Sequence, residues 1–218
     1  MTKSAAGPSQ GDRPPGGERG EAPIGGEYPT GLVLRPAALA DAADIARVRI
    51  ESWRATYRGL IPDAYLDGMQ VDASTAIWER VLAATTTVAS VFVVAHDATV
   101  VGFAAGNRLA EPKYDLDAEL SAVYLRPDYQ RAGLGHRLVG AVVDAQRTGG
   151  ATGLIVWTIA GNKPARAFYE QLGGALLVEQ PFQWDGVDLI EAGYGWNDLA
   201  ALASACLTAP APQISTMH

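Results

Sequence analysis

The sequence has very few of the residues that support a disulfide framework or a metal centre. Cys206 is the only cysteine, so no disulfide can form within the chain. The histidines, His96, His136 and His218, are scattered, and no group of Cys, His and acidic residues has the spacing of metal ligands. We therefore expect no metal, and the sequence offers no cysteine nucleophile with a histidine base beside it.

Long apolar runs and an excess of basic residues are also missing. No hydrophobic segment reaches bilayer-spanning length, and the first residues lack the basic and then apolar pattern of a secretion signal. Lys and Arg total 17 against 24 Asp and Glu, a net charge of −7. Nucleic acids and anionic membranes need a basic face, so we expect neither as a partner and expect a cytoplasmic protein. The acidic balance would suit a cationic amine, or serve only solubility.

The chain divides into a core segment and two tails. Residues 1–30 contain twelve Gly or Pro and almost no apolar side chains, so they cannot bury enough surface to offset the entropy of ordering. We expect this segment to be disordered. Residues 201–218, which include Pro210 and Pro212, are expected to be a flexible tail. Residues 31–200 are long enough for one domain with a full core.

Hydrophobic periodicity in the core segment predicts interleaved strands and helices. The predicted strands are Leu32–Arg35, 88–95, Thr99–Gly106, Glu119–Leu125, Leu154–Thr158, Ala175–Gln180 and Val187–Tyr194. The predicted helices are Asp41–Tyr57, a short one within Ile61–Met69, Asp72–Ala83, one from His136 to about Arg147, and Pro164–Leu172. Because some strands form hairpins, the predicted fold class is α/β with a mixed sheet flanked by helices.

The segment Gln130-Arg131-Ala132-Gly133-Leu134-Gly135 is the most informative stretch. It lies between a predicted strand and a predicted helix, where backbone N–H groups without partners and the helix dipole attract an anion. Its glycines let an oxyanion approach the backbone closely. The expected ligand is a phosphate or pyrophosphate.

Two common phosphate loops are excluded. The string G-x-x-x-x-G-K-S/T does not occur, and Leu138 stands where a dinucleotide loop needs its third glycine. The remaining pattern, Gln/Arg-x-x-Gly-x-Gly/Ala, resembles the pyrophosphate loop of the GNAT superfamily of acetyl-CoA-dependent N-acetyltransferases. The segment 162–173, which has Asn, then a short helix with Phe-Tyr and a closing Leu-Gly, resembles the other GNAT signature.

The resemblance covers roughly Leu32 to Leu199. The phrase 52–62, Ser-Trp-Arg-Ala-Thr-Tyr-Arg-Gly-Leu-Ile-Pro, and the closing 194–199 are similar to one large, mostly uncharacterised GNAT branch. One position departs from the pattern: Gly174 stands where the family normally has Phe after Leu-Gly. This removes an apolar anchor, which affects local packing more than chemistry.

The resemblance implies the GNAT acyltransferase fold and direct transfer of acetyl from acetyl-CoA to an amine. It also implies that the pyrophosphate binds backbone N–H groups of the loop and that the central strand offers main-chain bonds to the pantetheine. Asn162 would bind the cofactor or hold its loop, or would only cap the following helix. The implied cofactor-binding residues are Val123, Tyr124, Leu125, Gln130, Arg131, Ala132, Gly133, Leu134, Gly135, His136 and Asn162.

The reaction needs a group that protonates the leaving thiolate and one that accepts a proton from the amine. Tyr169 is placed like the family's general acid, although it could simply pack its helix on the sheet; Phe168 is interpreted as core. Glu119, at the start of the central strand, is the best candidate base, and its alternative is an ordinary carboxylate at a strand edge. Glu111, Asp115 and Asp117 are weaker substitutes.

The acceptor site is the least readable part of the sequence. Trp53, Tyr57 and Trp157 are candidate walls, with Tyr114 a further one, although aromatic residues at helical spacing such as Trp53 are more often core. The primary expectation is an enzyme acting on a small-molecule or peptide amine. A non-catalytic acetyl-CoA sensor and a protein N-terminal or lysine acetyltransferase are the alternatives. The resemblance also suggests a homodimer, with the oligomeric state left open.

Overall fold

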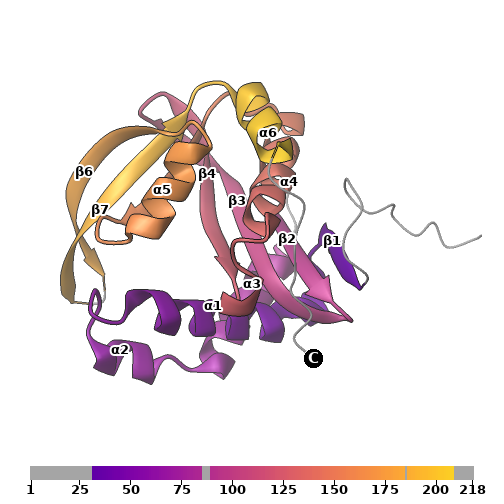
Figure 1. The fold of residues 1–218 in the computed structure, drawn as a ribbon, viewed down its shortest axis with the longest axis vertical. Helices are drawn as coiled ribbons and strands as arrows, with labels where there is room; N and C mark the ends of the chain where they lie inside the picture. The colour runs from indigo at the N-terminus through magenta and orange to yellow at the C-terminus, as the bar shows by residue number, and fades with distance from the viewer. Residues whose placement is uncertain (1–30, 85–88, 185, 209–218) are drawn as a thin grey trace, which may run out of the picture.

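The protein is described by a computed structural model that covers residues 31–84, 89–184 and 186–208 (Figure 1). The predicted disordered segment 1–30 lies outside these residues. Seven strands of the described chain form one sheet in the order β1-β2-β3-β4-β5-β7-β6. They are β1 (Leu32–Pro36), β2 (Ala89–His96), β3 (Thr99–Lys113), β4 (Leu116–Leu125), β5 (Leu154–Ile159), β6 (Ala175–Trp184) and β7 (Val187–Trp196).

Neighbouring strands pair antiparallel except β4 and β5, which are parallel. The helices are α1 (Ala42–Tyr57), α2 (Asp63–Gly68), α3 (Val71–Ala83), α4 (Leu134–Thr148), α5 (Lys163–Gln171) and α6 (Leu199–Leu207), with short 3-10 turns η1 (Leu39–Asp41) and η2 (Pro127–Tyr129). The predicted mixed sheet flanked by helices is confirmed. None of the helices in the described ranges is long and apolar enough to cross a membrane.

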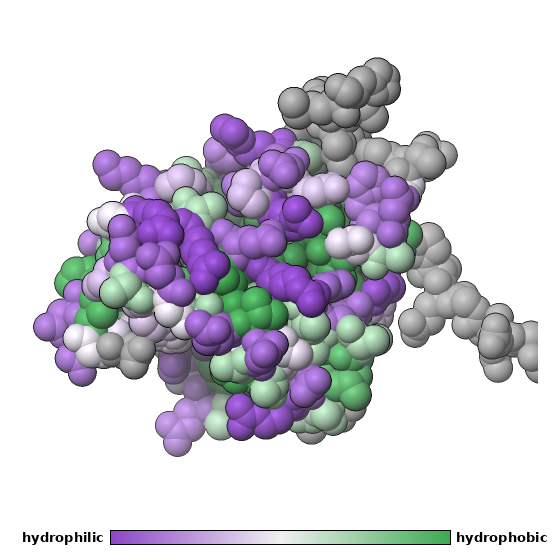
Figure 2. Space-filling view, turned by 90° about the horizontal axis from the view of Figure 1, so that it is seen from below, coloured by the Kyte–Doolittle hydropathy of each residue, from purple (hydrophilic) through white to green (hydrophobic). Residues whose placement is uncertain are grey.

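The helices divide between the two faces of the sheet. In Figure 1, α1, α2 and α3 lie together along the bottom, and α4, α5 and α6 lie on the opposite side. Ile45 of α1 and Trp78 of α3 pack on Phe103 of the sheet, whereas Leu138 of α4 and Leu202 of α6 belong to the core of the other face. Seen from below, hydrophilic residues dominate the surface and hydrophobic ones gather in a few patches (Figure 2), as expected for helices whose apolar stripes face inward.

The parallel pair β4–β5 is short, and this positions the site. Residues Ala118–Leu120 pair with Leu154–Val156, and no pairing between the two strands continues beyond Leu120 in the described chain. On its other edge, β4 carries an extra residue, Ser121, in a bulge opposite Ala105 and Gly106. A bulge bends its strand, and β4 parts from β5 just after Leu120, next to this bulge.

Several predicted boundaries were wrong. The loop predicted between Gly106 and Glu119 is instead an extension of β3 and β4 into a hairpin, whose tip residues Tyr114 and Asp115 have positive φ. Many residues of this extension are exposed and polar, so the sequence there lacks the alternation of apolar and polar residues that predicts a strand. Helix α4 begins two residues earlier than predicted, at Leu134, so Gly135 lies inside its first turn.

The expected flexible tail over 201–218 was also wrong where the structure describes it. Residues up to Leu207 form α6, which Asp198 caps by accepting hydrogen bonds from the backbone N–H groups of Ala200 and Ala201 at 2.9 Å. Cys206 is buried, and an added Cβ at Gly140 of α4 would lie 3.1 Å from its Cβ. The lone cysteine therefore helps to pack two helices.

The glycine that replaces the family's usual Phe is accommodated by a neighbouring indole. A Cβ at Gly174 would lie 2.7 Å from the ring of Trp196, so this ring already fills the space. The Trp196 indole N–H donates a buried 2.9 Å hydrogen bond to the carbonyl of Leu172. Trp196 thus supplies the anchor that the sequence suggested was missing.

Candidate active site

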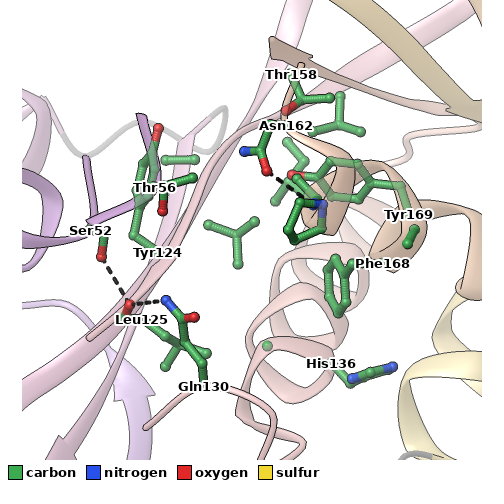
Figure 3. Close-up of a pocket in the computed structure, with 18 of the residues that line it drawn as sticks. Ser52, Thr56, Tyr124, Leu125, Gln130, His136, Thr158, Asn162, Phe168 and Tyr169 are labelled. Atoms are coloured by element: carbon green, nitrogen blue, oxygen red, sulfur yellow. Dashed lines mark hydrogen bonds between the residues drawn. The ribbon is translucent and has the colours of Figure 1, made fainter. Parts of the chain in front are cut away.

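A cavity of about 650 Å³ opens where β4 and β5 part. Its walls come from α1, β4, the η2–α4 loop, β5 and α5, so segments far apart in sequence meet there (Figure 3). Most of the predicted site residues line it: Tyr57, Val123, Tyr124, Leu125, Gln130, Arg131, Gly133, Gly135, His136, Trp157, Asn162 and Tyr169.

The N-terminus of α4 faces this cavity without a side-chain cap. Gly133, the N-cap residue, has φ +77°, a left-handed conformation that favours glycine. The first N–H groups of the helix are therefore available to an anion, as predicted. Ala132 and Leu134 are buried in the core, so they can serve a ligand only through their backbone.

His136 stands beside this helix end, with its ring edge-on to Phe168 at 5.0 Å between centroids. Burial lowers its pKa, which keeps the imidazole neutral at neutral pH. Phe168, interpreted from sequence as core, is only partly buried and lines the cavity. His136 and Phe168 thus form an uncharged wall next to the anion site.

The free edge of β4 runs along the cavity. The Leu125 carbonyl accepts hydrogen bonds from Ser52 Oγ at 2.9 Å and from Gln130 Nε2 at 3.0 Å (Figure 3). A ligand that used this carbonyl would have to displace one of the two donors. Backbone groups of successive residues alternate between the two edges of a strand. The N–H and C=O of Val123, two residues before Leu125, therefore point to the same free edge of β4 as the Leu125 carbonyl.

Tyr169 lies at the inner end of the cavity, on α5. Its side chain is 5% exposed, and its hydroxyl makes no hydrogen bond to another residue within the described chain. Burial, with Tyr124 and Tyr57 nearby, raises its pKa far above the usual 10. The phenol is therefore fully protonated and its O–H is available to a ligand.

Tyr57 and Asn162 join α1 to the start of α5. Asn162 accepts a hydrogen bond from the Ala165 N–H at 3.2 Å, so it caps α5, and its Nδ2 donates to the Tyr57 hydroxyl at 3.3 Å. Burial raises the pKa of Tyr57 to about 12. Both readings of Asn162 from sequence are compatible with this position, since it caps the helix and lines the cavity.

Glu119 lines a second, adjacent cavity of about 460 Å³ instead of the first. It is half-buried, and burial raises its pKa, against the opposing effect of Lys113 and with a further upward effect of Glu191. Trp157 lines both cavities, so the cavity of Glu119 adjoins the slot between β4 and β5. Tyr114 also lines the second cavity.

Trp53 lies outside the lining of both cavities. It is buried in an aromatic cluster, with ring centroids 5.0 Å from Tyr57, 6.3 Å from Tyr65 and 5.7 Å from Trp184. Its packing on the inner side of α1 accounts for its place in the apolar stripe. This packing agrees with the reading of Trp53 as a core residue, and its role as a wall of the acceptor site stays a prediction.

Sequence reasoning missed several lining residues. Ser52 carried a signal, because it is a polar residue on the apolar stripe of α1. Thr56 and Thr158 carried none. Part of the wall of the second cavity comes from β6 and β7, where residues with no local motif converge: Gln180, Phe182 and Glu191. Within the described ranges, no group of three or more His, Cys, Asp and Glu could hold a metal ion.

Comparison with known proteins agrees with this geometry. The profile of the Acetyltransferase (GNAT) family matches residues 50–174. The uncharacterized N-acetyltransferase YuaI of Bacillus subtilis is 33% identical over 172 residues, covering 78% of this chain and 96% of YuaI.

Two solved structures show the same fold at 20% identity. The PaiA N-acetyltransferase of Thermoplasma acidophilum, in complex with coenzyme A, aligns with a TM-score of 0.57 over 74% of this chain and 97% of its own. YncA of Salmonella typhimurium, solved with its cofactor acetyl-CoA, aligns with a TM-score of 0.55 over 77% of this chain and 94% of its own. The family match and the similarity to YuaI establish that this chain belongs to the GNAT family of acetyltransferases.

Proposed function

We propose that the protein transfers an acetyl group from acetyl-CoA directly to a primary amine of a small molecule. One observation carries the proposal. The uncapped N-terminus of α4, the free edge of β4 and the hydroxyl of Tyr169 all face one slot between β4 and β5. A pyrophosphate, an amide-bearing arm and a thioester would meet these groups in the order in which coenzyme A carries them.

The residues of the slot fit this cosubstrate. The helix end at Gly133 supplies backbone N–H groups and a positive dipole for the pyrophosphate, with Arg131 beside it as a positive charge. The Val123 backbone would bond the pantetheine amides. A β4 N–H next to the slot would polarise the thioester carbonyl, as an oxyanion hole does.

Tyr169 would act as the general acid. When the amine nitrogen bonds to the acetyl carbon, the carbon–sulfur bond breaks, and the phenol gives its proton to the sulfur. A phenol with a raised pKa is a weaker acid, but burial also raises the pKa of the thiol that forms in the same place. The phenol remains protonated at neutral pH, so its proton is available for the transfer.

Glu119 would accept the proton that the amine loses. A raised pKa makes its carboxylate a stronger base than an exposed glutamate. The position of the Glu119 cavity beside Trp157, and its aromatic walls, favour an amine with an apolar body. Peptide amines remain an alternative that the amine panel below tests.

The first experiment measures acetyl-CoA binding by calorimetry and thiol release with a panel of amines and short peptides. Gly133→Asp should weaken acetyl-CoA binding about tenfold or more, since it places a negative charge at the helix end. Gly150→Asp is the matched control: Gly150 also has positive φ, +82°, but lies at the other end of α4 with nothing within 4 Å of an added Cβ.

Equal affinity of both variants and the wild type would overturn the pyrophosphate assignment. Acetyl-CoA binding without thiol release for any amine or peptide would indicate a sensor and overturn the transfer reaction. Release with peptides alone would favour a protein acetyltransferase.

A further inference from the structure

The Glu119 cavity, the 460 Å³ space described above, has an unusual set of walls. Apart from Glu119 itself, it is lined by a second carboxylate, an amide, a lysine and three aromatic rings. They come from the tip of the β3–β4 hairpin, from β5 and from the β6–β7 hairpin: Lys113, Tyr114, Trp157, Gln180, Phe182 and Glu191. No short stretch of sequence contains this set, so the fold alone creates it.

The two carboxylates are held in different ways. Glu191 Oε1 accepts a hydrogen bond from Gln180 Nε2 at 2.7 Å across the β6–β7 pair, which fixes it at the cavity. The Glu119 carboxylate makes no hydrogen bond within the described residues, so its oxygens remain available to a ligand. A neutral amide holds Glu191, and the negative charge of the pair is offset only by Lys113 among the lining residues.

The aromatic side of the cavity favours a cation. Tyr114 and Trp157 lie 6.3 Å apart between ring centroids, and the Lys113 ammonium lies 5.8 Å from the Trp157 ring centroid. Ammonium groups are attracted to the face of an indole, and nearby carboxylates attract the same positive charge. Lys113 thus already places an alkylammonium near Trp157, in a cavity that both glutamates line.

Trp157 links this cavity to the transfer slot. Its ring packs on the backbone of Gly193 of β7, where an added Cβ would lie 2.8 Å from the ring. Trp157 is also one of the residues that line the slot between β4 and β5. An amine beside Trp157 is therefore next to the place where we position the thioester.

We propose that the Glu119 cavity binds the acceptor as an ammonium ion, and that it selects amines with an apolar body and no carboxylate next to the nitrogen. This deepens the proposed function and rests on it. A carboxylate on the acceptor would meet two negative charges, Glu119 and Glu191, against the one positive charge of Lys113, so the net effect of the lining is repulsion. The bound ammonium gives one proton to Glu119 before the amine attacks, and Lys113 is a built-in competitor for the same place.

The test uses two acceptors that differ in one group, 2-phenylethylamine and phenylalanine. Thiol release gives kcat/KM for each, and calorimetry gives the affinity of each for the protein loaded with coenzyme A. We expect 2-phenylethylamine to be preferred by about tenfold or more. Glu191→Gln should lower the kcat/KM and the affinity for 2-phenylethylamine about tenfold, and should reduce its preference over phenylalanine. Lys113→Met should raise the affinity for 2-phenylethylamine.

Glu179→Gln is the matched control, because Glu179 lies on the same β6–β7 hairpin but forms an ion pair with Arg166 and does not line the cavity. Equal or better use of phenylalanine, no binding of either amine, or no effect of Glu191→Gln in a folded variant would overturn the inference. Binding of 2-phenylethylamine that depends on Glu191, without thiol release, would support the cation site and contradict the proposed transfer reaction.

Discussion

Tyr169 and Tyr194 offer a test of the general acid, because two buried tyrosines lie side by side with opposite hydroxyl environments. Their ring centroids are 6.0 Å apart. The Tyr169 hydroxyl has no hydrogen bond to another described residue and faces the cavity. The Tyr194 hydroxyl donates to Glu170 Oε1 at 2.7 Å and accepts from Arg166 Nε at 3.0 Å. Replacing each tyrosine by Phe removes one oxygen and leaves the ring.

The two substitutions should affect different quantities. Tyr169→Phe removes no hydrogen bond within the protein, so the free energy of unfolding should change by less than about 1 kcal/mol. A lost general acid should lower kcat by about 10²–10⁴-fold, or about 3–5 kcal/mol in the barrier. Tyr194→Phe should cost about 1–3 kcal/mol of stability, since its bonds involve charged partners, and leave kcat within about twofold.

The assays are thermal or denaturant unfolding, acetyl-CoA affinity by calorimetry, and thiol release at saturating amine. Tyr169→Phe should keep the wild-type affinity for acetyl-CoA. A kcat within about twofold of wild type for Tyr169→Phe would refute the general-acid role. An equal loss of kcat in both variants would instead mean that ring packing, which the two positions share, controls turnover.

Two further predictions concern pH. Burial would raise the pKa of Asp41, but hydrogen bonds from Arg35 at 2.7 and 2.8 Å and from the Ala38 N–H outweigh this effect and lower the pKa below 3.8. Wild type should therefore have a higher free energy of unfolding than Asp41→Asn at pH 7, and denaturant titrations should show that this difference disappears as the pH falls below 3.8. Burial raises the pKa of Glu119, against the effect of Lys113, so wild-type kcat/KM should fall on an acid limb above pH 4.5 that Glu119→Gln lacks; an unchanged limb in that variant would assign the base elsewhere.

Much of the lining of the slot between β4 and β5 could be predicted from sequence because its signals are local. Gly133 and Gly135 mark the junction between a strand and a helix, and the segment around Tyr169 matches the second GNAT signature. Both patterns can be recognised without knowing which distant residues they contact. The same holds for the central elements, whose apolar periodicity is strong. Even here the predicted start of α4 was two residues too late, because glycine near the start of a helix is more typical of a loop.

The second cavity could not be predicted, because its walls meet only in the folded chain. Glu191 lies on a strand that was predicted, but Phe182 lies beyond the predicted end of β6 at Gln180, and no local motif indicates that the two side chains meet. Pro181 is tolerated because β6 is at the edge of the sheet, where its missing N–H leaves no bond unmade on the open side. Helix α6 was missed for a related reason: its Ala-rich sequence lacks a clear polar face.

The choice of base shows most clearly what the fold adds to the sequence. Asp117 and Glu119 are two residues apart on one strand, and their chemistry alone does not separate them. Asp117 accepts hydrogen bonds from the Thr152 and Gly153 N–H groups and pairs with Arg108 at 3.0 Å. Burial would raise its pKa, but these amide bonds outweigh it and lower the pKa, so Asp117 is a poor base that fixes the start of β5. Glu119 has no such donors and a raised pKa, and it alone of the two faces the cavity beside Trp157.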